Sequence, residues 1–518
     1  MADVSSRPLS HSNTDGIDRA TVWDDGLFER AAADHRLFEW ILTSGGDERI
    51  AIDPATGRNR YGAPSGTAGD EIWFSSSTAS AVSPRGYQAA LEAVRGLARA
   101  DKTWPVTGWF DRIRARLGAL FGIPRTEIIL ASSGTELELI ALVLFRNMLR
   151  RPLTNVVIAP TETGRGVPLA AAGRHFLTTA PFAAEVECGG LLDGLETPAS
   201  QIEIVEIRDP NGVLLSADSI DEAVVRKVEA AIVGGRDVLV HLLDCSKTHR
   251  TGLQRRTASA LMARYPDRVV IVVDACQVRC SREQIQADLD AGFMVMITGS
   301  KFAGGPPFAG ALLLPPWIVE RLRSVKLPQG LLAYTAANDW PLALRGALDG
   351  GFAAAANIGM GLRWEAALAE LEGLFALDMV LREQVTARFS ELVCQRASSS
   401  SCFDLIDRDH GDIRHRTIFP IVTSGGNGMP LAADAVQRAL LAPLHVAGVP
   451  DRVFQVGQSV AIGNRSAVRV CLSAPQITDV GERMRAGKEF EAAFAPLAAD
   501  VADLFRKWSY VASRPDPG

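Results

Sequence analysis

The sequence lacks the long apolar runs and paired cysteines that mark membrane and secreted proteins. No stretch of 18 residues is apolar and free of charge, so we expect no membrane span. The seven cysteines are scattered, and Cys276 and Cys280 have no second pair or nearby histidine to complete a zinc site. We therefore expect reduced thiols and no bound metal. The polar N-terminus has no apolar signal core, which predicts a cytoplasmic protein.

Signatures of nucleic-acid and nucleotide binding are missing as well. The net charge is −6 and no basic stripe with interleaved aromatic residues occurs, so we expect no nucleic-acid partner. Neither Gly-x-x-x-x-Gly-Lys-Ser/Thr nor Gly-x-Gly-x-x-Gly is present, which disfavours a nucleotide-binding protein. The chain does contain 47% hydrophobic residues over 518 positions, enough for one large domain and at least one smaller domain.

Alternating strand and helix patterns predict an α/β doubly wound fold in the middle of the chain. The expected strands are continuous apolar runs, as in a mostly parallel central sheet covered on both faces. They span residues 127–131, 154–159, 202–207, 237–243, 269–274, 293–298 and 309–314. Helical patterns are expected at about 27–42, 84–100, 135–149 and 218–233.

The remainder of the chain predicts a smaller α+β C-terminal domain. A long helical segment at about 346–392 precedes strands at 403–407, 416–423 and 459–473 and helices at 431–442 and 478–508. We divide the chain into a disordered N-terminus (1–20), an N-terminal segment (21–104), a large domain (105–345) and a small domain (346–518).

Two of the expected buried strands lead to residues whose side chains can take part in catalysis. The strand 269–274 ends in Asp274, and the next strand leads to Lys301, 27 residues after Asp274. This layout is typical of a site for pyridoxal 5′-phosphate (PLP), where a lysine amine forms a Schiff base with the aldehyde. The acid keeps the pyridine nitrogen protonated, so that the ring accepts electrons. Burial and the nearby cationic ring would help Lys301 lose its proton.

A second lysine competes with Lys301 for the Schiff-base role, and Asp274 has a simpler interpretation. Lys247, in the segment 244–252, also follows an apolar run, but it precedes the strand that ends in Asp274 instead of following it. We therefore predict that Lys301 is the Schiff-base residue. An acid at a strand end also often caps the next helix, so Asp274 alone is weak evidence.

A phosphate site is expected where the strand 127–131 runs into Ser133, Gly134 and Thr135. Glycine lets the backbone approach a ligand, the start of the following helix offers free N–H groups, and the hydroxyls add donors. Serine and threonine are also ordinary helix caps. Together with Asp274 and Lys301 downstream, the phosphate interpretation is the better one.

In the order of these motifs, the sequence over about 71–475 resembles the fold type I PLP-dependent enzymes, most of all their class V aminotransferase and cysteine desulfurase branch. The resemblance implies a fold type I large domain and a homodimer with the site between two subunits. It implies that Ser246 contacts the cofactor's phenolic oxygen, that Asp274 and Gln277 form the Asp-x-x-His/Gln pair, and that a hydroxyl beside Lys301 binds phosphate. The residues it adds to the cofactor site are Thr163, Ser246, Gln277, Thr298, Ser300 and Thr335, the last donated by the partner subunit.

The same resemblance implies a substrate side made of Ser77, Thr78 and Arg469, with Arg469 gripping the substrate carboxylate. Arg465 competes for that role, and a plain strand arginine is the simpler reading of Arg469. Two further cations, Arg165 and Arg250, would suit an acidic or phosphate-bearing co-substrate, although each is singly an ordinary surface charge.

The sequence departs from the branch in two places. No histidine or aromatic residue follows the second strand to stack on the cofactor, and Thr163 takes that position. No mobile cysteine lies shortly before Arg469, and Cys402 is interpreted as structural, so we do not expect desulfurase activity.

These observations predict an enzyme that acts on an α-amino acid through an external aldimine and a quinonoid. Amino-group transfer is the expected reaction. The alternative is a PLP-dependent lyase or a Cβ/Cγ-replacement enzyme that forms carbon–carbon bonds in specialised metabolism, for example with S-adenosylmethionine. A non-catalytic relative with the same fold is a third possibility, disfavoured because Lys301 and Asp274 are both present.

Overall fold

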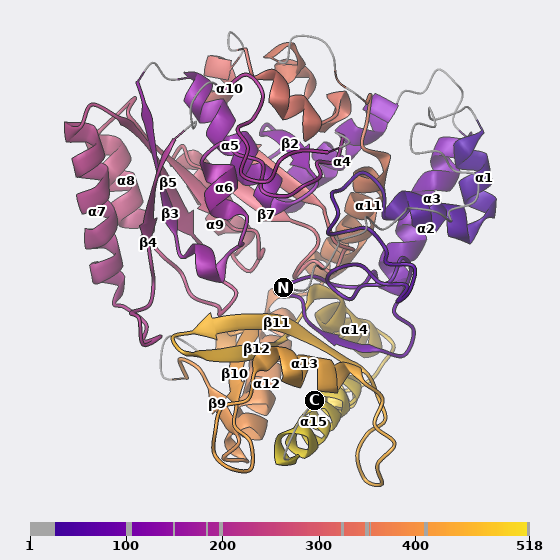
Figure 1. Ribbon diagram of the computed structural model, residues 1–518. Coiled ribbons are helices and arrows are strands. Elements are labelled where there is room, and N and C mark those ends of the chain that lie inside the picture. The colour runs from indigo at the N-terminus through magenta and orange to yellow at the C-terminus, as the bar shows by residue number, and fades with distance from the viewer. Residues whose placement is uncertain are drawn as a thin grey trace, which may run out of the picture.

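The computed structural model describes residues 26–99, 106–148, 151–182, 185–195, 200–322, 326–347, 352, 354–408 and 413–514. The stretch 1–20, predicted to be disordered, lies outside these residues. The described chain forms two sheets, each covered by helices (Figure 1). Among the described residues, no helix is long and apolar enough to cross a membrane.

The larger sheet has seven strands in the order β2-β8-β7-β6-β5-β3-β4. Strands β7, β6, β5, β3 and β4 are parallel to one another, and β8 runs antiparallel to both β2 and β7. Most are buried along their length, as their apolar sequences require. The prediction of a mostly parallel central sheet is confirmed, and the strands are β2 (Glu127–Ala131), β3 (Leu153–Ile158), β4 (Gln201–Val205), β5 (Asp237–Leu243), β6 (Val269–Asp274), β7 (Met294–Thr298) and β8 (Gly310–Leu314).

Helices cover both faces of this sheet. One face carries α5 (Gly134–Met148), α6 (Val167–Ala171) and α10 (Pro316–Leu322). Helix α5 is buried from Thr135 to Phe145; most of these residues are apolar, but Glu136 and Glu138 are buried with them. The other face carries α3 (Pro84–Arg99), α4 (Val106–Phe121), α7 (Ala217–Val233), α8 (Arg255–Arg264), α9 (Arg282–Asp290) and α11 (Ile358–Phe375).

The second sheet has five strands in the order β1-β11-β12-β10-β9. The members are β1 (Ile72–Phe74), β9 (Phe403–Leu405), β10 (Ile418–Thr423), β11 (Phe454–Ile462) and β12 (Arg465–Cys471). Its core also includes α12 (Met379–Ser398), α13 (Ala433–Leu441), α14 (Ala474–Arg485) and α15 (Phe490–Ser513). This arrangement is the expected α+β unit. Strand β1 comes from the predicted N-terminal segment and α11 packs on α3 and α4, so the predicted domain boundaries stay a proposal.

Two predicted helices are divided in the structure, each at an aspartate. The segment 27–42 forms α1 (Leu27–Ala33) and α2 (His35–Leu42), because Asp34 is extended and its carboxylate accepts a hydrogen bond from Arg36 N. Likewise, Asp378 ends the run that begins with α11 and caps α12. Short 3₁₀ helices complete the chain: η1 (Pro160–Glu162), η2 (Gln329–Ala333), η3 (Ala337–Asp339), η4 (Leu342–Ala347) and η5 (Ile413–His415).

Candidate active site

The candidate site lies at the carboxyl edge of the large sheet, where three neighbouring parallel strands end. Asp274 is the last residue of β6, the middle strand of the three. Lys301 follows β7 on one side, and Lys247 follows β5 on the other. Carboxyl ends of parallel strands are where α/β sheets bind ligands. The parallel topology therefore brings both candidate lysines close to the candidate acid.

The residues around Asp274 form a connected set. The carboxylate accepts a hydrogen bond from Cys276 N at 3.1 Å. Thr298 Oγ1 donates to Cys276 O at 2.6 Å, which fixes the end of β7 against that of β6. Gln277 Nε2 donates to Ser77 O at 3.0 Å, and within the described residues the buried Gln277 Oε1 has no partner. Asp274, Gln277 and Thr298 are thus brought together.

Lys301 sits in a tight turn directly after Ser300, and both are half-buried. Its carbonyl accepts hydrogen bonds from Ser80 Oγ and Gly304 N, both at 3.0 Å. In the described part of the chain, the ammonium has no hydrogen-bond or ion-pair partner. The main chain of Lys301 is therefore fixed while its amine is left available.

The predicted phosphate loop lies at the start of α5. Thr135 N donates to Ser133 Oγ at 3.2 Å. At Gly134, an added Cβ would lie 3.0 Å from Cys276 Sγ, so the close approach of α5 to β6 favours glycine here. Arg49 donates to Ser133 Oγ at 3.1 Å and to Thr135 Oγ1 at 3.4 Å. A guanidinium thus joins the two hydroxyls of the loop.

Arg49 is held from all sides. Its guanidinium pairs with Asp47 at 2.6 Å and lies 3.7 Å from Glu136. The rings of Phe176 and Phe308 lie 5.4 and 4.8 Å from it. Burial raises the pKa of Glu136 to about 7, and the charge of Arg49 opposes this shift. Sequence reasoning missed Arg49, because it stands in an irregular loop whose contacts with α5 no local pattern reveals.

The three predicted substrate residues meet on the second sheet. Arg469 of β12 is buried, and its Nη1 and Nη2 donate to Ser77 Oγ at 2.9 Å and Thr78 Oγ1 at 2.7 Å. Its Nε donates to Gln458 O at 2.9 Å. Burial lowers the pKa of Arg469 to about 10. The neighbouring Gly457 leaves room for this side chain, since a Cβ there would lie 2.9 Å from the Arg469 Cβ.

Ser246 is bound to a carboxylate that the sequence analysis did not select. Its Oγ donates to Glu162 Oε2 at 2.8 Å and accepts from Thr248 N at 3.0 Å. The Thr248 hydroxyl donates to the same carboxylate, and Arg208 Nε donates to Glu162 Oε1 at 2.6 Å. The hydroxyl of Ser246 is therefore engaged within the protein. Lys247 projects from the same loop, and its backbone N donates to Glu162 O at 2.9 Å.

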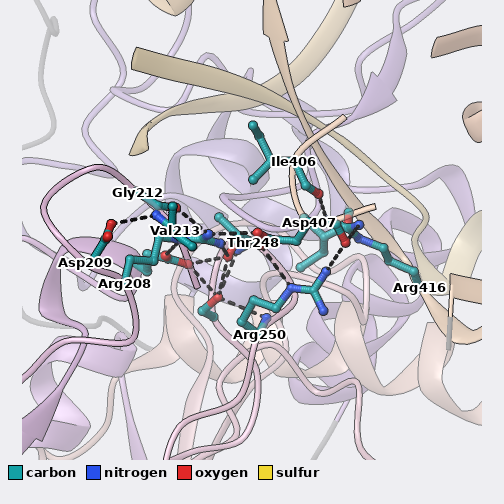
Figure 2. Close-up of polar contacts among 12 residues, drawn as sticks. Arg208, Asp209, Gly212, Val213, Thr248, Arg250, Ile406, Asp407 and Arg416 are labelled. Carbon is teal, nitrogen blue, oxygen red and sulfur yellow. Dashed lines mark hydrogen bonds and ion pairs between the residues drawn. The ribbon is translucent and has the colours of Figure 1, made fainter. Parts of the chain in front are cut away.

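The same network continues to the second sheet through Asp407 (Figure 2). Arg208 makes two hydrogen bonds to the Asp407 carboxylate, at 3.0 and 2.5 Å. Arg250 Nε donates to that carboxylate at 3.1 Å, and Arg416 Nη1 donates to the Asp407 carbonyl at 3.3 Å. Arg250, considered above as a cation for a co-substrate, is thus paired with Asp407. We call Glu162, Arg208, Arg250 and Asp407 the charge bridge.

Two predicted cofactor residues lie apart from these contacts. Thr335 is fully buried, accepts a hydrogen bond from Trp340 Nε1 at 2.6 Å and donates to Asp339 Oδ2 at 3.4 Å. Thr163 is half-buried behind η1, and its hydroxyl donates to Pro160 O at 3.5 Å. Within the described residues, neither hydroxyl makes a hydrogen bond to another predicted site residue. Their roles stay predictions.

Comparison with known proteins finds structures that share the fold but no match in sequence. No protein family model matches the chain, and no curated protein resembles it in sequence. The fold is shared with solved PLP-dependent enzymes, which confirms the predicted fold type I architecture.

Three of these structures illustrate the likeness. The cysteine desulfurase CsdA from Escherichia coli has a TM-score of 0.52 and 11% identity, with 85% of this chain and 94% of that chain covered. The cystine C–S lyase C-DES, solved with its product cysteine persulfide, has a TM-score of 0.53 and 13% identity, with 84% of this chain and 98% of that chain covered. An Oryza sativa protein named TDC, solved with PLP and tryptamine, has a TM-score of 0.50 and 12% identity, with 86% of this chain and 84% of that chain covered.

Proposed function

We propose that this protein is a PLP-dependent enzyme that acts on an α-amino acid, with amino-group transfer as its reaction. One observation carries the proposal: Asp274 lies at the carboxyl end of one strand and Lys301, whose amine has no partner among the described residues, follows that of the adjacent strand, in a fold shared with PLP-dependent enzymes. A strand acid and a neighbouring free lysine are the two groups that this chemistry requires.

The residues present fit PLP in three respects. The helix start at Gly134, the hydroxyls of Ser133 and Thr135 and the guanidinium of Arg49 suit a phosphate dianion. Gly134 keeps this cradle free of a side chain. Gln277 Oε1, buried and without a partner among the described residues, offers an acceptor three residues after Asp274.

Bound there, PLP would supply an aldehyde that condenses with amines and a ring that accepts electrons. Asp274 would hold a proton on the ring nitrogen, because an ionised carboxylate favours the cationic form of a partner. Lys301 would act as nucleophile and then carry the substrate's α-proton. Arg469, fixed by Ser77 and Thr78, would orient the substrate carboxylate.

Several finer features belong to the same proposal. We infer a cytoplasmic homodimer with the site between two subunits, as the family resemblance implies. Amino transfer is favoured over the alternative, a lyase or a Cβ/Cγ-replacement enzyme of specialised metabolism. The scaffold alone does not select the reaction.

The experiment that tests the proposal is the visible absorption spectrum of the purified protein after addition of PLP. We expect a yellow Schiff-base band that shifts with one member of a panel of amino acids. Product analysis with and without a keto acid then separates the reactions, because amino transfer alone depends on the keto acid. A protein that takes up no PLP would refute the proposal. Product formed over many turnovers without a keto acid would indicate elimination or replacement, because amino transfer without an acceptor stops after one equivalent per site.

Arg49 provides a separate prediction about cofactor affinity. Replacing Arg49 by Met should weaken PLP binding about 10- to 100-fold, because a charge-assisted hydrogen bond contributes about 1.5–3 kcal/mol. Arg49→Lys should recover part of the loss. The measurement is a titration of cofactor-free protein with PLP followed by absorbance. Arg226→Met, at an exposed arginine of α7, is the matched control and should bind PLP like the wild type. Equal affinity in Arg49→Met would contradict a phosphate site at this loop.

A further inference from the structure

Positive charge accumulates on one side of the candidate site. The loop that carries Arg165 lies against the loop that carries Lys247, because Lys247 N donates to Glu162 O at 2.9 Å and Arg165 follows Glu162 by three residues. Lys301 follows β7 at the same edge of the sheet, and burial together with the charges of Arg469, Lys301 and Arg165 lowers the pKa of Lys247. Glu162 raises the pKa of Lys247, but its carboxylate already accepts hydrogen bonds from Ser246, Thr248 and Arg208. The group therefore carries more positive than negative charge.

The position of Lys247 is set by its loop. Its backbone N donates to Glu162 O at 2.9 Å, Ser246 N donates to Arg250 O at 2.7 Å, and Arg250 N donates to Ser246 Oγ at 3.1 Å. The charge bridge holds this loop against the second sheet. Within the described chain, the Lys247 ammonium has no hydrogen-bond or ion-pair partner. Lys247 is thus a half-buried amine on a fixed backbone.

Arg165 completes the group from a third element. It follows η1, two residues after Thr163, and its side chain is exposed. No ion pair with a described residue occupies its guanidinium. Lys247, which is half-buried, and Arg165 thus have no carboxylate partner among the described residues, and an anion bound there would supply the missing charge.

We propose that the substrate carries a second anionic group, a carboxylate or a phosphate, in addition to its α-carboxylate, and that Lys247 and Arg165 bind it. This inference rests on the proposed function, because it takes Lys301 and Arg469 as the groups that hold the amino-acid end. It defines the substrate class as acidic or phosphate-bearing amino acids. Lys247 is then a specificity residue and not a second Schiff-base lysine.

The test is calorimetric binding of amine-free probes to the PLP-loaded protein: glutarate with two carboxylates, 3-phosphonopropionate with a carboxylate and a phosphonate, and butyrate with one carboxylate. We expect at least one dianion to bind about tenfold or more tightly than butyrate. Lys247→Met and Arg165→Met should each remove most of this preference, and Lys247→Arg should keep it. Lys488→Met, at an exposed lysine between α14 and α15, should leave it unchanged. The tighter dianion identifies the second group as carboxylate or phosphate.

The pH dependence gives an independent readout. Burial, together with the charges of Arg469, Lys301 and Arg165, lowers the pKa of Lys247 to about 7, whereas Glu162 raises it. The Lys247 amine therefore loses its proton as the pH rises through 7. Glutarate, ionised throughout this range, should bind more weakly at pH 8 than at pH 6 in the wild type. The difference should disappear in Lys247→Arg, because a guanidinium keeps its charge.

The outcomes separate this inference from the proposed function. A Schiff-base band together with equal binding of butyrate and both dianions would overturn the inference and leave the function standing. Absence of the band after addition of PLP, with Lys247-dependent binding of a dianion to the same protein, would refute the function and the substrate assignment and leave only an anion site at Lys247. A preference that persists unchanged in Lys247→Met and Arg165→Met would place the second anion elsewhere and overturn the inference.

Discussion

Replacing Lys301 by Ala is expected to abolish the covalent attachment of PLP and to reduce kcat by about 10²- to 10⁴-fold or more. The variant loses both the nucleophile that anchors the cofactor and the group that transfers the α-proton. The main chain should be little disturbed, because its contacts at this turn use the Lys301 carbonyl, with Ser80 and Gly304 as donors. Borohydride reduction followed by peptide mapping should find the label on Lys301 in the wild type.

Lys247→Ala is the matched control for this prediction. Lys247 follows β5, the strand on the opposite side of Asp274 from β7. The substitution therefore removes an equivalent amine from the same edge of the sheet. We expect its protein to retain the yellow band and the borohydride label. A label on Lys247 in the wild type, or a band that survives in Lys301→Ala, would reverse the assignment of the two lysines.

Replacing Asp407 by Asn should lower the free energy of unfolding by about 3–5 kcal/mol, because a buried pair loses one partner. The side chains of Asp407 and Arg208 are both 8% exposed, and Arg250 also depends on this carboxylate. Asparagine keeps the shape and tolerates the left-handed backbone of Asp407, where φ is 54°. The midpoint of urea unfolding measures the loss.

The pH dependence of this loss is a further check. Burial opposes ionisation of Asp407, but the Arg208 hydrogen bond and the charges of Arg208, Arg250 and Arg416 outweigh it and lower the pKa. A carboxyl whose pKa is lower in the folded state stabilises the fold when the pH is above its unfolded-state pKa of about 3.9. This stabilisation is lost as the pH falls through the pKa of the folded state. Wild type and variant should therefore differ most near neutral pH and converge in acid.

An exposed pair provides the control for the Asp407 result. Glu222 and Arg226 of α7 lie 3.8 Å apart, with side chains 72% and 69% exposed. Glu222→Gln should change the free energy of unfolding by less than about 1 kcal/mol. If Asp407→Asn were equally mild, the charge bridge would contribute no more than a surface ion pair.

The sequence predicts well what depends on neighbouring strands. Apolar runs locate the strands of the large sheet, and parallel topology then places Asp274, at the end of β6, beside β7, the strand that leads to Lys301. Ser77, Thr78 and Arg469 also meet as the family resemblance implies. In each case a residue follows or lies on a strand whose pairing is set by hydrophobic periodicity.

What the sequence could not predict are contacts that depend on irregular loops. Arg49 reaches Thr135 from 86 positions away, through a segment without periodicity. Ser246 looks available in the sequence, yet Glu162, 84 positions away, takes its hydroxyl. Thr335 likewise looks like a donor to a ligand but is held by the Trp340 indole. Side-chain partners of this kind are decided by tertiary packing, which a single sequence does not reveal.

The pairing of β1 with β11 has a consequence for synthesis of the chain. Ile72 lies opposite Phe454, so β1 leaves the ribosome about 380 residues before the strand that pairs with it. At about 5–20 residues per second, that interval is roughly 20–80 s. During this time β1 has no strand to pair with, and an unpaired strand edge can pair with a segment of another chain. Correct assembly of the half of the site that holds Arg469 must therefore wait until β11 and β12 have been synthesised.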